Sequence, residues 1–305
     1  MDYQNKVAVI TGGGGGIGHG YALACLKEGM KVVLADISQE RLDEISARLA
    51  EEVPGAEVLT YRMDVSSMEQ TRELASFALE KFGRIDMAFN NAGVHFHKAF
   101  TLMTDNDWEF IIRSNMLGAL NGMRVFIPIL EKNEEGGTVI NTASSSSISF
   151  GTTMAHYCMT KAAVLHLSGA VAAEMIEYGS KVNVMCVMPD FVTSNLLDSC
   201  ADVKAAMGLT NEVEEQTQLD IGNESNFYNM VTYPYRGLVP IQPPMEIPEV
   251  GMTIFTMTNE KAGEVVMQAI KDKKQFVLTH GGKMSNPNFM AGQILSGYII
   301  NGSLG

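Results

Sequence analysis

Two residues with complementary acid–base chemistry, Tyr157 and Lys161, stand four positions apart in the sequence. Residues at positions i and i+4 share one face of a helix, and the stretch at residues 155–178 has the periodicity of a helix. An ammonium beside a phenol favours the phenolate and lowers the phenol's pKa from its ordinary value of about 10. The pair is therefore suited to proton transfer. The spacing alone is common in helices and carries little weight.

Three further features give this pair a chemical context. Ser144 follows an apolar run at residues 138–142. Asn-Asn-Ala-Gly ends an earlier apolar run at residues 90–93, and Asn115 lies in the helical stretch after it. The Ser144 hydroxyl can hold a substrate oxygen by a hydrogen bond while Tyr157 removes or returns its proton. The combination favours proton transfer at an alcohol or a carbonyl.

A glycine-rich segment, Thr11-Gly-Gly-Gly-Gly-Gly-Ile-Gly18, follows an apolar run and opens a helical stretch. Glycines allow a tight turn there and let backbone N–H groups approach a pyrophosphate at the helix N-terminus. The next apolar run ends in Asp36, close to the offset of about 20 residues expected of an acid that binds a dinucleotide ribose. Its carboxylate would repel the 2′-phosphate of NADP, and no Lys or Arg lies between Gly12 and Gly18. The segment therefore predicts NAD as the cofactor.

The elements that must position these residues alternate between short apolar runs and longer amphipathic stretches, which is typical of an α/β fold with a parallel sheet. Strands are expected at residues 7–10, 31–35, 57–62, 87–90, 138–142 and 182–187. Helices are expected near residues 17–28, 39–52, 68–82, 105–130 and 155–178.

The regular alternation ends near residue 195, and residues 195–251 are rich in proline and glycine. Because this segment also carries many aromatic residues and methionines, it is expected to be a substrate lid within a single domain of residues 1–305. A helix near 260–271 and a strand at 275–279 follow. Residues 280–305 form a C-terminal extension, with a final helix expected from residue 288.

Over residues 5–195, the sequence resembles the short-chain dehydrogenase/reductase family. The resemblance rests on six features in order along the chain: Thr-Gly-x-x-x-Gly-Ile-Gly, Asp64-Val65, Asn-Asn-Ala-Gly, Asn115, Ser144 and Tyr-x-x-x-Lys. The resemblance implies one doubly wound, Rossmann-like parallel sheet. It also implies hydride transfer between a secondary alcohol or its ketone and nicotinamide C4. Finally, the resemblance implies a homodimer or homotetramer built on the helices that contain Asn115 and Tyr157.

Carried over residue by residue, the resemblance assigns roles to both sites. Gly12, Gly16 and Gly18 line the pyrophosphate, Asp64 and Val65 flank the adenine, and Asn91 lies beside the ribose, together with Ile17, Gly93, Pro189 and Val192 as further cofactor-binding residues. Lys161 would also bind the nicotinamide ribose, and Asn115 would position a water for a proton relay. The implied catalytic group is Asn115, Ser144, Tyr157 and Lys161.

One segment departs from the family pattern of Pro-Gly, an apolar residue and Thr after the sixth strand. Here it reads Pro189-Asp-Phe-Val-Thr-Ser-Asn195, so Asp190 replaces a flexible glycine. With the C-terminal extension, this form is similar to that of bacterial members that oxidise aryl carbinols of the lignin type.

The residues expected to meet the substrate are His95, Phe150 and Met154, beside an aromatic lid with few cations. Such surroundings favour a hydrophobic alcohol or ketone, such as an aryl carbinol or a hydroxysteroid, over a phosphate-bearing substrate. The rival interpretation is a non-catalytic protein that binds NAD as a sensor or scaffold, which the fold alone allows.

Composition limits the other function classes. The formal net charge of -13 would repel nucleic acid and anionic membranes. The apolar runs fall far short of the ~20 residues of a membrane helix, and the N-terminal residues lack a secretion signal, so a cytoplasmic protein is expected. The four cysteines are widely separated, and the histidines lack an acidic partner at ligand spacing, so neither disulfides nor a metal site is expected.

Overall fold

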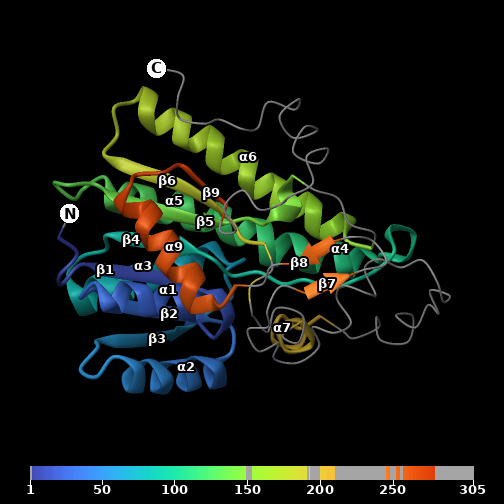
Figure 1. Cartoon of the computed structure of the whole chain (residues 1–305), viewed down its shortest axis with the longest axis horizontal. Coiled ribbons are helices and arrows are strands. Elements are labelled where there is room, and N and C mark those ends of the chain that lie inside the picture. Colours follow the sequence, from blue (N-terminus) through green and yellow to red (C-terminus); the bar gives the residue numbers. More distant parts are fainter. Residues whose placement is uncertain are drawn as a thin grey trace.

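The fold is built on one parallel sheet. The computed structural model describes residues 2–148, 153–190, 192, 200–209, 245–247, 252–254 and 257–278. Seven strands lie in the order β3-β2-β1-β4-β5-β6-β9, so the sheet grows from β1 in one direction and from β4 in the other (Figure 1). The strands are β1 (Val7–Thr11), β2 (Lys31–Asp36), β3 (Val58–Arg62), β4 (Met87–Asn90), β5 (Gly137–Thr142), β6 (Val182–Met188) and β9 (Phe276–Leu278). The predicted doubly wound, Rossmann-like parallel sheet is confirmed.

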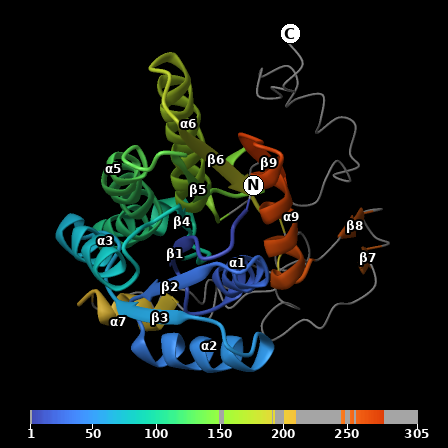
Figure 2. The same ribbon diagram turned by 90° about the vertical axis from the view of Figure 1, so that its left-hand side faces the viewer.

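Helices cover both faces of this sheet, as the end-on view in Figure 2 shows. One core joins the sheet to α1 (Gly16–Lys27), α2 (Gln39–Glu52) and α9 (Asn259–Lys271). The other core joins it to α3 (Met68–Phe82), α5 (Gly118–Leu130) and α6 (Ala155–Glu177). Within β1, Ala8 and Ile10 enter the first core and Val9 enters the second. Because both faces are buried, the strands appear in the sequence as continuous apolar runs.

The helix predicted at residues 105–130 is divided into three parts. The helix α4 (Asp105–Ile112) is followed by a π-helical turn, η2 (Arg113–Leu117), and then by α5. A π-turn accommodates one extra residue in a helix and occurs mostly at functional sites. The turn contains Asn115, so the correction to the predicted helix concerns a candidate catalytic residue directly.

The segment expected to be irregular carries regular elements where the structure describes it. The helix α7 (Cys200–Ala206) is rich in alanine, a strong helix former, and β7 (Met245–Ile247) pairs antiparallel with β8 (Met252–Ile254). The predicted final helix from residue 288 and the C-terminal extension lie outside the described residues. None of the helices in the described part is long and apolar enough to cross a membrane.

Candidate active site

The candidate residues meet at the carboxyl ends of the central strands, where the strand order of the sheet reverses direction. Thr11 ends β1, Asn91 follows β4, and Thr142 ends the neighbouring β5. In doubly wound sheets, ligands bind at this switch point, outside the carboxyl ends of the strands. The side-chain contacts described below link the glycine-rich turn, Gly93 and the Tyr157 helix at this edge.

The helix α6 carries both members of the acid–base pair. Tyr157 is 7% exposed and Lys161 is 4% exposed. The Lys161 Nζ donates a hydrogen bond to the Thr142 carbonyl oxygen at 2.9 Å and lies 5.7 Å from the centroid of the Tyr157 ring. Burial disfavours the charged form and lowers the pKa of Lys161 to about 8. The site thus holds a poorly solvated amine beside a phenol.

Asn115 lies in the π-turn, and its side chain holds the segment after β4. Its Oδ1 accepts a hydrogen bond from the Val94 backbone N–H at 2.7 Å. Its Nδ2 donates to the Val94 carbonyl oxygen at 3.0 Å and to Thr160 Oγ1 at 3.3 Å. A Cβ on Gly93 would lie 3.2 Å from both Asn115 Oδ1 and Lys161 Nζ. The structure therefore gives Asn115 a positioning role at Val94, and the water relay remains a prediction.

Ser144 is held by a short 3-10 turn, η3 (Ser145–Ser147). Its Oγ accepts a hydrogen bond from the Ser146 backbone N–H at 3.1 Å, and the hydroxyl hydrogen can still be donated to a ligand oxygen. The turn is tied to the end of β6, because Ser145 N–H donates to the Pro189 carbonyl oxygen at 2.8 Å. Ser145 Oγ also donates to Asp190 Oδ1 at 3.1 Å. The residue that replaces the usual glycine thus helps to hold the turn that Ser144 begins.

The glycine-rich turn is locked against the segment after β4. Gly12 has a φ of +64°, a conformation that side chains disfavour, and a Cβ on Gly18 would lie 2.1 Å from the Gly12 carbonyl oxygen. Thr11 Oγ1 accepts from the Asn91 N–H at 3.0 Å, and Asn91 Nδ2 donates to the Thr11 and Gly12 carbonyl oxygens at 3.1 and 3.3 Å. Asn91 therefore supports the shape of the predicted pyrophosphate turn.

Asp36 lies beside this turn at the end of β2. Its Oδ2 accepts a hydrogen bond from the Gly14 N–H at 3.0 Å, and its Oδ1 accepts from the Ser38 N–H at 3.1 Å. Each carboxylate oxygen can accept more than one hydrogen bond, so both retain capacity for ribose hydroxyls. The acid and the glycine-rich turn are thus adjacent, as the predicted dinucleotide site requires.

The remaining predicted cofactor residues are held by contacts with other elements. Asp64 accepts hydrogen bonds from Arg113 Nη2 at 3.0 Å and from the Ser66 N–H at 2.8 Å. The Val65 carbonyl oxygen accepts from Asn121 Nδ2 at 3.1 Å. At the other residues, Gly16 begins α1, Ile17 packs against the first core, Pro189 holds η3, and Val192 forms an isolated bridge with Met257.

Two of the three predicted substrate residues join Tyr157. Met154 belongs to the same buried cluster, and the ring centroids of His95 and Tyr157 lie 4.4 Å apart. Phe150 lies outside the described residues. Sequence reasoning did not identify Thr160, which accepts from Asn115 and donates to the Tyr157 carbonyl oxygen at 2.9 Å. Its place between Tyr157 and Lys161 was the only signal available.

A buried ion cluster beside the site was also missed. The Asp107 carboxylate, which is fully buried, lies 2.6 Å from Lys98 Nζ and 3.2 Å from Lys204 Nζ. Hydrogen bonds from Lys98 and Thr104 outweigh burial and lower the pKa of Asp107 to about 2. Lys204 belongs to α7 and also lies over the rings of Phe96 and Phe110. No local pattern in the sequence connects these three distant charges.

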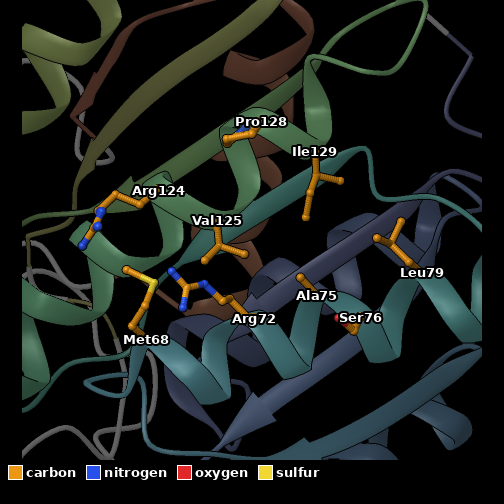
Figure 3. Close-up of a pocket in the computed structure, with 9 residues that line it drawn as sticks. All are labelled: Met68, Arg72, Ala75, Ser76, Leu79, Arg124, Val125, Pro128 and Ile129. Carbon is orange, nitrogen blue, oxygen red and sulfur yellow. The ribbon is translucent and has the colours of Figure 1, made fainter.

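Two further observations bear on where chemistry can occur. Within the described part of the chain, no three His, Cys, Asp or Glu side chains are grouped to hold a metal ion. A groove of about 420 Å³ lies between α3 and α5 and is lined by residues such as Arg72, Arg124 and Ile129 (Figure 3). It contains none of the candidate catalytic residues, so the site is defined by the side-chain contacts at the sheet edge.

The chain is similar to known proteins over the part that carries these residues. Residues 6–204, which contain all four candidate catalytic residues, match the family described as short chain dehydrogenase. Meso-2,3-butanediol dehydrogenase of Serratia marcescens is 31% identical over 247 residues, covering 78% of this chain and 95% of that protein. The NAD(+) 15-hydroxyprostaglandin dehydrogenase of Mus musculus is 30% identical over 220 residues, covering 71% and 78%. A short chain dehydrogenase/reductase from Burkholderia phymatum, solved in complex with NAD, has a TM-score of 0.76 and 28% identity, covering 97% of this chain and 94% of that one.

Proposed function

Because the chain belongs to the short-chain dehydrogenase family, we propose that it is an NAD-dependent oxidoreductase that interconverts a hydrophobic secondary alcohol and its ketone. The observation that carries this proposal is the buried Lys161 ammonium beside the Tyr157 ring, next to Gly93 at the switch point. A buried amine and a phenol beside a predicted dinucleotide site are suited to proton transfer.

The proposed reaction assigns one step to each side chain. During oxidation, the Tyr157 phenolate takes the proton of the substrate hydroxyl, and the Lys161 ammonium stabilises the phenolate. Ser144 holds the same substrate oxygen by a hydrogen bond. NAD held at the glycine-rich turn and Asp36 would supply the acceptor for the hydride that leaves the carbinol carbon. In the direction of reduction, the Tyr157 phenol returns the proton to the carbonyl oxygen.

The residues present fit NAD. Gly12 and Gly18 leave the backbone open where a Cβ would clash, and Asp36 offers both carboxylate oxygens beside the turn. NAD is also the cofactor in the Burkholderia phymatum structure and in the name of the Mus musculus relative. These points support NAD binding from independent directions.

The rival proposal, an NAD-binding sensor or scaffold without catalysis, is tested by a broad screen for NADH formation. Secondary alcohols of the aryl carbinol and hydroxysteroid classes should give NADH and the corresponding ketones. The named relatives act on molecules as different as a small diol and a prostaglandin, so the class of hydrophobic alcohol stays a prediction. A protein that binds NAD but oxidises no alcohol in the screen would favour the sensor.

We also propose that the chain forms a homodimer or homotetramer through α5 and α6. Two apolar side chains of α6 are exposed, Met159 at 43% and Ile176 at 66%. Exposed apolar residues along one helix are suited to an interface with a second copy. Light scattering coupled to size exclusion should give twice or four times the mass of the chain, and a monomer at micromolar concentration would rule out this assembly.

We also propose that α7 belongs to the predicted substrate lid, and this leads to a prediction about the local stability of α7. Lys204 Nζ pairs with Asp107, and Cys200 Sγ donates to the His95 carbonyl oxygen at 2.9 Å. These two contacts hold α7 against Asp107 and the predicted substrate residue His95. Lys204→Met keeps the length of the side chain but removes its charge, and Asp107 keeps Lys98 as a partner. The amides of residues 200–209 should then exchange hydrogen roughly tenfold faster, a loss of about 1.4 kcal/mol in local stability.

The control for this variant is Lys271→Met, which removes an exposed ion pair between Lys271 and Glu28 far from the site. Such pairs contribute little, so its exchange in residues 200–209 should match the unchanged protein. Equal exchange rates in Lys204→Met and Lys271→Met would show that the ion pair does not fasten α7. In the unchanged protein, binding of NAD and substrate together should slow exchange in this segment.

A further inference from the structure

The segment after β4 is held almost residue by residue. Both backbone polar groups of Val94 bond to the Asn115 amide, and the His95 carbonyl oxygen accepts from Cys200 Sγ. The Phe96 carbonyl oxygen bonds to His156 Nε2 at 2.9 Å, and the Lys98 N–H donates to the Thr153 carbonyl oxygen at 3.0 Å. Such dense bonding fixes the backbone on both sides of His95. The side chain of His95 is therefore presented from a rigid frame.

The ring of His95 is packed between two other rings. Its centroid lies 4.4 Å from that of Tyr157 and 4.7 Å from that of His97. The residue is 8% exposed. Burial, and then the neighbouring His97, His156 and Lys161, lower the pKa of His95 well below its usual value of 6.5. The imidazole is thus neutral at physiological pH and offers one donor and one acceptor nitrogen.

One of these nitrogens lacks a partner among the described residues. The Nδ1 of His95 is buried and makes no hydrogen bond within that part of the chain. A buried polar atom left without a partner costs about 1 to 3 kcal/mol, so proteins usually provide one. The hydrogen-bonded backbone and the contacts with two rings restrict the orientation of the His95 ring. A bound substrate can supply the partner that the described residues do not.

We propose that His95 is a specificity-determining residue that binds a second oxygen atom of the substrate, on the carbon next to the carbinol carbon. The preferred substrates would then be vicinal diols in one direction and 2-hydroxyketones in the other. This inference rests on the proposed function, because Tyr157 must bind the first oxygen.

Geometry favours the neighbouring carbon as the position of the second oxygen. In the proposed mechanism Tyr157 and Ser144 both bind the reacting oxygen, and each hydrogen bond spans about 2.7 to 3.2 Å. With the two ring centroids only 4.4 Å apart, His95 and Tyr157 can serve two oxygens only if those oxygens are close together. Vicinal oxygens meet that condition. A distant polar group on a long substrate does not.

The test uses two matched pairs of alcohols in which one hydroxyl becomes a methyl group: 1-phenylethane-1,2-diol with 1-phenylpropan-1-ol, and 2,3-butanediol with 3-methylbutan-2-ol. For each pair, kcat/KM for NADH formation is measured, and gas chromatography confirms oxidation at the secondary carbon. The unchanged protein should prefer the diol by roughly 10- to 100-fold, since the simple alcohol leaves His95 unpaired.

Two variants attribute the preference to His95. His95→Phe keeps an aromatic ring against Tyr157 but has no nitrogen, so the ratio of diol to alcohol should fall to about one. His95→Gln restores a hydrogen-bonding group and should recover part of the ratio. The control Lys271→Met, which removes an ion pair far from the site, should keep the full ratio. Melting temperature and NAD affinity check that the variants fold.

The outcomes separate this inference from the proposed function. Equal kcat/KM for diol and alcohol in the unchanged protein would overturn the inference alone, and an ordered water would then be the partner of Nδ1. A preference that survives in His95→Phe would overturn it as well. No oxidation of any of the four alcohols, nor of any alcohol in the broad screen, would overturn the proposed function and this inference with it.

Discussion

Replacing Tyr157 with phenylalanine should lower kcat by about 100- to 10,000-fold, the range for loss of a general acid or base. The substitution removes only the hydroxyl, and the ring that packs on His95 and Met154 stays in place. Melting temperature and NAD affinity should therefore change little while turnover collapses. The measurement is NADH formation at saturating NAD, on any alcohol that the unchanged protein oxidises. Near-normal turnover would overturn the mechanism and leave the cofactor assignment intact.

Lys161→Met provides the companion experiment. It removes the ammonium beside Tyr157 and leaves the Thr142 carbonyl oxygen without its bond. Turnover and NAD affinity should both fall, because Lys161 is assigned to the phenolate and to the ribose. In the double variant the losses should combine less than additively, since without the phenol there is no pKa for the ammonium to lower. Fully additive losses would mean that the two side chains act separately.

The expected preference for NAD over NADP is also a large effect. The kcat/KM with NAD should exceed that with NADP by at least ~100-fold, on the order of 3 kcal/mol for a repelled phosphate. The reason is the position of Asp36, whose two oxygens bond the Gly14 and Ser38 amides beside the turn. Asp36→Ala should narrow the gap by removing this negative charge. Equal use of both cofactors by the unchanged protein would contradict the argument.

Element positions were predicted well where local signals were complete. The predicted bounds of α2, α3 and β4 match the structure. In α3, Ser67 caps the N-terminus by accepting from the Gln70 N–H, and Gly83 ends the helix in a left-handed conformation. Both signals are readable from residue type and apolar periodicity. The glycine-rich turn and Ser144 were identified because each follows a recognisable strand, whereas Tyr157, Lys161 and Asn115 were identified by their places in helical stretches.

What could not be predicted depends on distant contacts. Arg113 holds Asp64, Lys204 holds Asp107, and Asn259 Nδ2 donates to the Gly16 carbonyl oxygen at 3.1 Å from the far end of the chain. Each of these pairs joins residues with no common local pattern. The π-turn was missed because apolar periodicity continues on both sides of it. The groups proposed to react could therefore be predicted from the sequence, whereas distant residues that hold the surrounding structure in place, such as Arg113 and Lys204, could not.

The π-turn η2 also sets the rotational phase of α5. Each residue advances an α-helix by about 100°, so deleting one residue between Arg113 and Leu117 would rotate α5 by that angle. The present phase directs Gly118 toward Val65 and Gly122 toward Asn90, where an added Cβ would lie 2.8 Å and 1.8 Å from side-chain atoms. Any rotation would bring bulkier residues to these contacts. This part of the chain can therefore tolerate substitutions more readily than a change in length.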